Sequence, residues 1–287
     1  MIPAQFDYLT PATLDEAISM LAEHSDEAKI LAGGHSLIPA MKLRLAMPQI
    51  LIDIGRISDL SYIREEGDEI RIGAMTTHYQ LESSDRLREI CPILPEAANL
   101  IGDVQVRNKG TLGGSVAHAD PAADWPAVMV ALNAQMVAVS GNGERIIDVD
   151  DFFVDMLTTA LEPGEILREI RIKKPTGRFG QAYAKVLQPA SGFAVVGVAV
   201  HLALDGTGAC ESVSIGITGV ASKAYRAFAV ESALKGTTLD QDKVKDAASH
   251  AVDGVDANGD LFASSDYRRH LAQVHTRRAI ESALARA

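Results

Sequence analysis

The sequence predicts an α+β protein, in which two mixed helix and strand units precede a C-terminal antiparallel sheet covered by helices. Short apolar stretches alternate with helical periods in the first half of the chain, whereas long alternating or apolar stretches follow residue 180. The chain has 287 residues, 47% of them hydrophobic, so it can bury substantial cores. We expect three units, which comprise residues 1–55, 56–176 and 177–287.

Residues 1–55 are expected to form a small α/β unit. The segment TLDEAISMLAEHSD (13–26) places Thr13 and Glu16 at the spacing of a capping box, and its apolar residues share one helix face. AKIL (28–31) and QILIDI (49–54) have the composition of buried strands. Between them, SLIPAMKLRLA (36–46) is expected to be helical, with its proline in the first turn.

The middle unit is expected to contain two hairpins, several helices and a closing strand. YIREEGDEIRIGA (62–74) and AQMVAVSGNGERIIDVDDFF (134–153) predict hairpins with glycine at their turns. THYQLESSDRLREI (77–90) and PILPEAANLIG (92–102) predict helices, and GEILREIRIKKP (164–175) predicts a strand. The Pro, Gly and charged residues of KKPTGRFG (173–180) mark the best domain boundary.

Composition and motifs exclude several classes of protein. The formal net charge of −11 argues against a nucleic-acid partner. The N-terminus does not resemble a signal peptide, and no apolar run reaches the ~18 residues of a membrane-spanning helix. We therefore expect a cytoplasmic protein, or one that a partner complex carries to the inner face of the membrane. GNGERI (141–146) lacks the third glycine of a dinucleotide-binding fingerprint and lies in an expected hairpin turn.

The two cysteines, Cys91 and Cys210, form no CxxC motif, so a cysteine-ligated cluster within this chain is not expected. We expect two unrelated core thiols, although the sequence leaves one disulfide open. Trp125 is the only tryptophan, and packing is its expected role.

Two glycine pairs stand next to hydroxyl and histidine residues, in LAGGHSLIP (31–39) and TLGGSVAHADPAADW (111–125). Glycine lets main-chain N–H groups approach a diphosphate closely, and it tolerates the positive φ that turns successive N–H groups inward. A following helix N-terminus adds a favourable dipole for phosphate. Either loop alone is more often a plain turn, so the prediction of a phosphate site depends on the presence of both.

Simpler structural roles remain open for several of these residues. His35 and His118 could be ordinary loop residues, and Asp120 or Asp124 could cap the helix DWPAVMVAL. Lys185 could be a solvated lysine at the edge of a sheet, and Phe193 could be a core residue. The C-terminal helix carries four arginines that we expect to be solvated or to face a partner: Arg268, Arg269, Arg277 and Arg278.

Four longer segments resemble one known family. AGGHSLIPAMKLRLAMPQILIDI (32–54), IGDVQVRNKGTLGGSVAHADPAADWPAV (101–128), GEILREIRI (164–172) and YRRHLAQVHTRRAIESAL (267–284) resemble the FAD-binding medium subunits of molybdenum hydroxylases. In length and motifs, the carbon monoxide dehydrogenase branch is the nearest. The resemblance extends over essentially the whole chain. It implies a FAD-binding fold similar to that of vanillyl-alcohol oxidase, with two α/β subdomains and a C-terminal domain that closes over the flavin.

The resemblance also implies which residues contact FAD. In the first loop these are Leu31, Ala32, Gly33, Gly34, His35, Ser36 and Leu37. In the second they are Thr111, Gly113, Gly114 and Ser115, the last replacing an asparagine common in the family. Ile101, Val106 and Gly110 would line the cofactor before that loop, and Asp124, Leu167 and Lys185 would make further contacts. Phe193 would lie near the isoalloxazine ring. No residue of this chain is expected to be catalytic or to bind a metal.

The function that the resemblance implies is electron transfer within a larger complex. A large subunit with a molybdopterin cofactor would oxidise the substrate, and a small subunit with [2Fe–2S] clusters would pass electrons to FAD in this chain. An external acceptor such as a quinone would then be reduced. We expect a dimer of heterotrimers that oxidises CO to CO₂. Oxidation of a purine, N-heterocycle or aldehyde is the alternative, and a nucleotide-binding module without a redox role is an alternative of another class.

Overall fold

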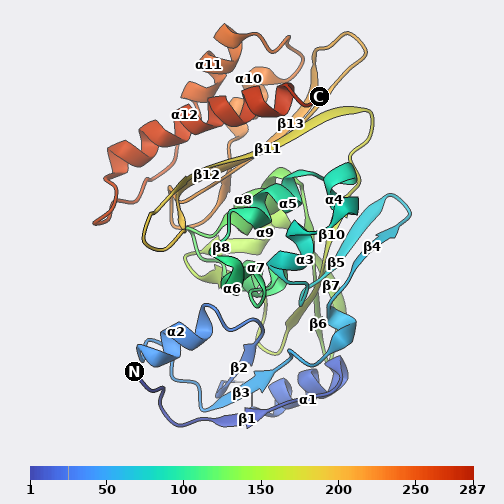
Figure 1. Cartoon of the computed structure of the whole chain (residues 1–287), viewed down its shortest axis with the longest axis vertical. Coiled ribbons are helices and arrows are strands. Elements are labelled where there is room, and N and C mark those ends of the chain that lie inside the picture. Colours follow the sequence, from blue (N-terminus) through green and yellow to red (C-terminus); the bar gives the residue numbers. More distant parts are fainter. Residues whose placement is uncertain (25) are drawn as a thin grey trace.

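Three larger sheets, besides a two-stranded ribbon, follow one another along the long axis of the molecule, from the N-terminal end to the C-terminal end (Figure 1). The computed structural model describes residues 1–24 and 26–287. The expected α+β class is confirmed, because parallel and antiparallel sheets occur beside separate groups of helices.

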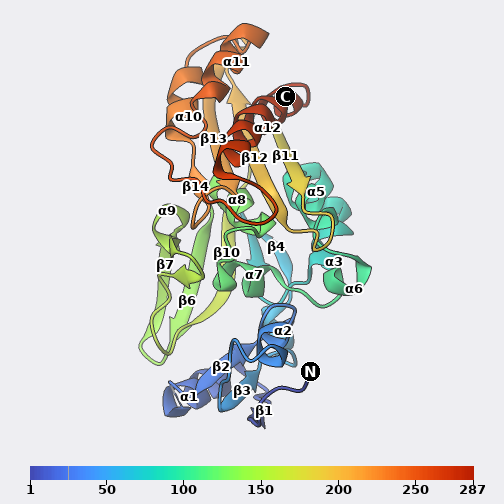
Figure 2. The ribbon, with the colours of Figure 1, turned by 90° about the vertical axis from the view of Figure 1, so that its left-hand side faces the viewer.

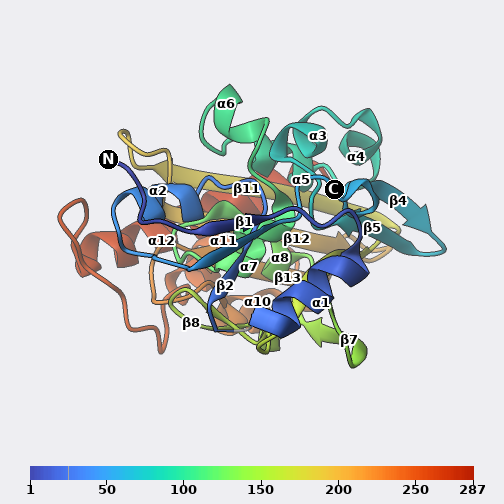
Figure 3. The ribbon, with the colours of Figure 1, turned by 90° about the horizontal axis from the view of Figure 1, so that it is seen from below.

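The first sheet is small and parallel, with strand order β1-β3-β2. Helices α1 and α2 lie at opposite ends of this sheet (Figure 1, Figure 3). A buried cluster around Ala17, Ile52 and Leu60 holds α1 against the strands. The elements are β1 (Asp7–Leu9), α1 (Leu14–His24), β2 (Ala28–Leu31), α2 (Leu37–Lys42) and β3 (Ile50–Asp53).

Two local details of this unit differ from the sequence prediction. The Thr13 hydroxyl caps α1 by accepting from Glu16 N at 3.2 Å, but the Glu16 carboxylate accepts from Ala12 N, one residue earlier than in a standard capping box. The helix predicted over 36–46 ends at Lys42, and Arg44 adopts a left-handed φ of 59°. Ser25, near the predicted end of the first helix, lies outside the described residues.

The second sheet is antiparallel, with strand order β4-β5-β10-β6-β7. Both predicted hairpins are confirmed. Its strands are β4 (Ile63–Glu66), β5 (Glu69–Gly73), β6 (Gln135–Ser140), β7 (Gly143–Asp148) and β10 (Ile166–Lys173). A short 3-10 helix (Ser58–Leu60) precedes it, and a two-stranded ribbon of β8 (Phe153–Asp155) and β9 (Thr158–Thr159) lies beside it.

Seven short helices accompany the second sheet, and several share a buried core with it around Leu94, Leu112 and Trp125. The segment 77–90, predicted as one helix, forms two, because the Ser84 hydroxyl accepts from Leu87 N and starts a second helix. The helices are α3 (His78–Glu82), α4 (Asp85–Ile90), α5 (Ile93–Asn99), α6 (Val104–Arg107), α7 (Leu112–His118), α8 (Asp124–Ala131) and α9 (Val149–Phe152).

The third sheet is antiparallel, with strand order β11-β12-β13-β14, and lies between α8 and the C-terminal helices (Figure 2). Residues 194–200 of β12 are all buried, which explains their unbroken apolar run: helices cover both faces of this sheet. The elements are β11 (Arg178–Leu187), β12 (Ala194–Leu204), β13 (Cys210–Thr218), β14 (Tyr225–Arg226), α10 (Phe228–Leu234), α11 (Gln241–Ser249) and α12 (Ser265–Leu284).

Cys91 and Cys210 are buried free thiols, as expected for two unrelated core cysteines.

Within the ranges 1–24 and 26–287, no helix is both long and apolar enough to cross a bilayer. One expectation for α12 is wrong: Arg268 is not solvated but buried, with 6% of its surface exposed.

Candidate functional site

The first glycine segment forms a turn between β2 and α2, with main-chain N–H groups available for a ligand. Gly34 has a φ of 75°, a conformation that favours glycine and turns the chain sharply before the helix. Within residues 1–24 and 26–287, the N–H groups of residues 33–37 have no protein acceptor, and none of these residues is fully buried. Consecutive unpaired N–H groups next to a helix N-terminus suit a diphosphate, so the donor set fits the phosphates of FAD.

The second glycine segment is not an open loop, which corrects the sequence prediction. Thr111 is the N-cap of α7, and its hydroxyl accepts from Gly114 N at 3.1 Å. Leu112 N donates to Thr76 O, and Gly113 N donates to Ala74 O. These amides already have protein acceptors, so α7 offers a ligand its N-terminal dipole and the Ser115 side chain rather than a row of free N–H groups.

The two segments, about 80 residues apart in the sequence, are in contact. A Cβ added to Gly33 would collide with the Lys109 carbonyl oxygen and lie 2.8 Å from Gly110 Cα. A Cβ added to Gly114 would lie 3.3 Å from the Ala32 side chain. The glycines therefore permit a close backbone approach, and the structure brings residues 32–34 and 109–114 to one place.

A short helix and a buried histidine support this junction. Asp103 caps α6 by accepting from Gln105 N and Val106 N, which fixes Val106 ahead of Gly110. His78 packs on Gly110 and accepts at Nδ1 from Trp125 Nε1 at 3.1 Å. Burial lowers the pKa of His78 to about 4, so the ring is neutral, as an acceptor must be.

Asp124 and Lys185 form a buried ion pair between the middle unit and the third sheet. Lys185 Nζ donates to Asp124 Oδ2 at 2.9 Å and to Leu100 O at 2.9 Å, and only 2% of its side chain is exposed. Tyr183 OH donates to Asp124 Oδ1 at 2.6 Å. Burial, assisted by the Asp124 carboxylate, raises the pKa of Tyr183, so this hydroxyl stays neutral.

This geometry excludes two simpler roles that the sequence left open, a helix cap for Asp124 and a solvated edge lysine for Lys185. Asp124 does not cap α8, because Ala123 is the N-cap and the Asp124 carboxylate bonds to β11 side chains instead. Lys185 is not a solvated edge lysine. Trp125 packs in the core, as expected, and its N–H group is also bonded.

The remaining predicted contacts lie at different depths. Ile101 is half-buried between α5 and α6. Its neighbour Gly102 lies beside the loop that carries Phe193, since a Cβ added to Gly192 would lie 3.7 Å from Gly102 Cα. Phe193 is 42% exposed rather than a core residue. Leu167 is buried at a bulge in β10. Their contacts with FAD, like those of the other predicted residues, remain predictions.

Sequence reasoning missed three residues of this region. Each is an isolated polar residue in the sequence, and only the folded chain shows that it is buried. His78 is bonded to Trp125, Tyr183 to Asp124, and Arg268 to Val195 of β12. Among the described residues, no group of three or more His, Cys, Asp or Glu side chains is arranged to hold a metal ion.

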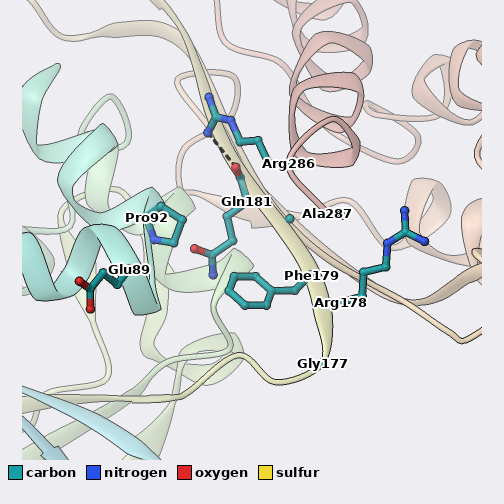
Figure 4. Close-up of a pocket in the computed structure, with 9 residues that line it drawn as sticks. Glu89, Pro92, Gly177, Arg178, Phe179, Gln181, Arg286 and Ala287 are labelled. Carbon is teal, nitrogen blue, oxygen red and sulfur yellow. Dashed lines mark hydrogen bonds between the residues drawn. The ribbon is translucent and has the colours of Figure 1, made fainter.

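A separate cavity of about 320 Å³ lies between α4, α5 and the start of β11 (Figure 4). Arg286, on its wall, donates to Gln181 O at 2.8 Å and to Glu96 Oε2 at 2.6 Å. This arginine ties residues after α12 to α5. None of the residues predicted to contact FAD lines the cavity.

Comparison with known proteins identifies two matching domains. The family described as FAD binding domain in molybdopterin dehydrogenase matches residues 4–175, and CO dehydrogenase flavoprotein C-terminal domain matches residues 181–283. The carbon monoxide dehydrogenase medium chain of Afipia carboxidovorans is 42% identical over 287 residues, which cover 100% of this chain and 99% of the relative.

Two solved structures extend this similarity to three dimensions. A chain of carbon monoxide dehydrogenase from Hydrogenophaga pseudoflava, in a form that lacks the Mo-pyranopterin moiety of the molybdenum cofactor, matches with a TM-score of 0.97 and 42% identity over 100% of both chains. A chain of quinoline 2-oxidoreductase from Pseudomonas putida 86 matches with a TM-score of 0.92 and 34% identity over 99% of both chains. The chain therefore belongs to the family of FAD-binding medium subunits of molybdenum-containing dehydrogenases.

Proposed function

We propose that this chain is the FAD-carrying electron-transfer subunit of an aerobic carbon monoxide dehydrogenase. The observation that supports CO as the substrate is the 42% identity to the A. carboxidovorans medium chain over the full length of this chain. In this proposal, CO and water become CO₂, two protons and two electrons at a molybdenum centre on a large subunit. The electrons reach this chain through [2Fe–2S] clusters on a small subunit.

The residues of this chain would bind and orient the cofactor. Bound FAD supplies the capacity to take up two electrons and to release them singly or together. The N–H groups of residues 33–37 would donate to its diphosphate, and α7 would add its N-terminal dipole. The buried Asp124 and Lys185 pair would hold β11 against Leu100 at one side of the site, and Phe193 would lie near the ring system.

The proposal includes an assembly and a location. We expect two copies each of the large, medium and small subunits, and a quinone as the external acceptor. Because a quinone is dissolved in the bilayer, the complex would work in the cytoplasm at the inner face of the membrane.

Anaerobic titration of the assembled complex with CO tests this function directly. We expect the flavin absorbance to bleach as CO is added, because in this proposal the electrons from the molybdenum centre pass through the [2Fe–2S] clusters to the flavin. Bleaching by an N-heterocycle or a purine, but not by CO, would contradict the proposed substrate. A colourless complex that FAD does not reconstitute would contradict the redox role itself.

The second candidate function is oxidation of an N-heterocycle by the same kind of complex. The observation that favours it is the similarity to the quinoline 2-oxidoreductase chain, at 34% identity over 99% of both chains. The titration above separates it from CO oxidation, because the two substrates are added to the same preparation.

A further inference from the structure

Arg268 is a buried cation outside the set of residues assigned to the cofactor. It lies on α12, and its Nη1 donates to Val195 O at 2.6 Å and to Gly219 O at 2.5 Å. Its Nη2 donates to Asp260 Oδ2 at 2.6 Å. One guanidinium group therefore joins the start of β12, the end of β13 and the loop before α12.

The strand ends that Arg268 holds also bind the segment directly before Asp124. Ala194 N donates to Ala122 O at 3.0 Å, and Gly219 N donates to Pro121 O at 2.7 Å. Thr218 Oγ1 lies within hydrogen-bond distance of Pro121 O, at 2.7 Å, and of Ala123 O, at 2.9 Å, so its one proton is shared between these two carbonyl groups. The carbonyl groups of residues 121–123 thus accept hydrogen bonds from the start of β12 and the end of β13, the same two strand ends that Arg268 holds.

The start of β12 also follows directly after Phe193, which is predicted to lie near the flavin ring. Val195 follows Phe193 by two residues, and the loop that precedes them contacts Gly102. A shift at Val195 would therefore move Phe193 and the acceptors at 121–123 together. It would also disturb Asp124, whose carboxylate holds Lys185.

Stability alone does not explain a charge at this position. Burying a guanidinium carries a large desolvation cost, and well-packed apolar replacements of buried ion pairs are often neutral or stabilising. Arg268 Nε is buried and has no acceptor among the described residues, which adds to the cost. The planar fork of an arginine is suited to holding several carbonyl oxygens at fixed positions.

We propose that Arg268 is a positioning residue, which fixes the ends of β12 and β13 against residues 121–124 and so sets the geometry in which this chain holds FAD. The proposal rests on the proposed function only in taking FAD as the cofactor of this chain, and it is independent of the substrate. Arg268 acts through Val195 and Gly219 and need not contact FAD itself.

The test compares three variants in the assembled complex. Arg268→Met removes the charge, and Arg268→Lys keeps the charge but lacks the planar fork of the guanidinium group. Arg278→Met changes an exposed arginine of the same helix and serves as the control. The measurements are the dissociation constant for FAD, the visible circular dichroism of the bound flavin and the melting temperature.

For Arg268→Met we expect about a tenfold or larger rise in the FAD dissociation constant, together with altered flavin dichroism in the fraction that retains FAD. Arg268→Lys should fall between this variant and wild type, and Arg278→Met should match wild type. Wild-type values for both FAD measurements in folded Arg268→Met would overturn the proposal. If Arg268→Met does not fold, Arg268→Lys decides, and wild-type FAD binding and dichroism in that variant would overturn the proposal equally.

These outcomes are separate from the test of the proposed function. A wild-type complex that binds FAD but is not reduced by CO contradicts only the substrate. A wild-type complex that does not bind FAD contradicts the flavin role, and the Arg268 proposal fails with it.

Discussion

Gly33 shows why the first glycine pair is needed. Its α-carbon lies against the backbone of Lys109 and Gly110, where a side chain has no space. Any Cβ would separate the turn at 32–37 from the start of α7 and so displace the N–H groups that we assign to the diphosphate.

We predict that Gly33→Ala weakens FAD binding by about tenfold or more and destabilises the chain by about 1–3 kcal/mol. Equilibrium dialysis of FAD and urea unfolding measure the two effects. Gly206→Ala is the matched control, because a Cβ there meets nothing within 4 Å. Equal FAD affinities for the two variants would show that the contact between the segments is unimportant.

His78 makes stability depend on pH. Its pKa is about 4 in the folded chain, against an ordinary value of 6.5, because the ring is buried. The unfolded chain therefore binds this proton at a higher pH than the folded chain. Stability should decrease as the pH falls from about 6.5 to about 4, by roughly 3 kcal/mol at most from this residue.

The variant His78→Gln, which still offers an acceptor to Trp125, should lose that part of the pH dependence. Urea unfolding followed by the fluorescence of Trp125, the only tryptophan, reports on the region around His78. The same slope of stability against pH in both proteins would contradict the assignment.

At the scale of residues, sequence reasoning succeeded where local chemistry decides the role. The glycine turn, the buried tryptophan and the free thiols follow from residue type and near neighbours. It failed for Arg268, because four arginines on one helix look alike until β12 and β13 place carbonyl oxygens beside one of them.

The helix α7 has a conformation that its glycine pair alone does not predict. TLGGS was predicted as a second glycine loop around the diphosphate, but it forms the first turn of α7, with its N–H groups bonded to the Thr111 hydroxyl and to the carbonyls of Ala74 and Thr76. Those carbonyls belong to a segment about 35 residues earlier in the chain. The residues next to TLGGS therefore do not reveal that its N–H groups are already bonded.

We predict that Thr111→Ala lowers stability by about 1 kcal/mol through loss of the cap, whereas Thr111→Ser, which keeps a hydroxyl, stays near wild type. Thermal unfolding of the two variants measures this. Because the amides of α7 are already paired, Thr111→Ala should change FAD affinity less than Gly33→Ala. The reverse order would assign the diphosphate to α7.

The ion pair between Asp124 and Lys185 connects the units at the scale of the whole molecule. Most strands and helices were predictable from periodicity, because each repeats a local pattern over many residues. How the three sheets are joined was not predictable from local patterns, because this pair and the bonds of residues 121–123 link distant segments.

We predict that Lys185→Met destabilises the chain by about 3–5 kcal/mol, because it leaves a buried carboxylate without its partner. The double variant Asp124→Asn with Lys185→Met should recover part of this loss. Arg88→Met, which removes an exposed ion pair with Asp85, is the control and should cost no more than about 1 kcal/mol. Urea unfolding decides, and similar losses for Lys185→Met and Arg88→Met would contradict a structural role for the buried pair.

Hydrogen exchange of the main-chain amides in the assembled complex, with and without FAD, tests whether the N–H groups of residues 33–37 bind the diphosphate. We predict strong protection of residues 33–37 when FAD binds, because these N–H groups have no acceptor in the described chain. The amides of residues 112–115 should change little, since they are bonded already. Unchanged exchange at 33–37 in a complex that has bound FAD would show that these N–H groups do not bind the diphosphate.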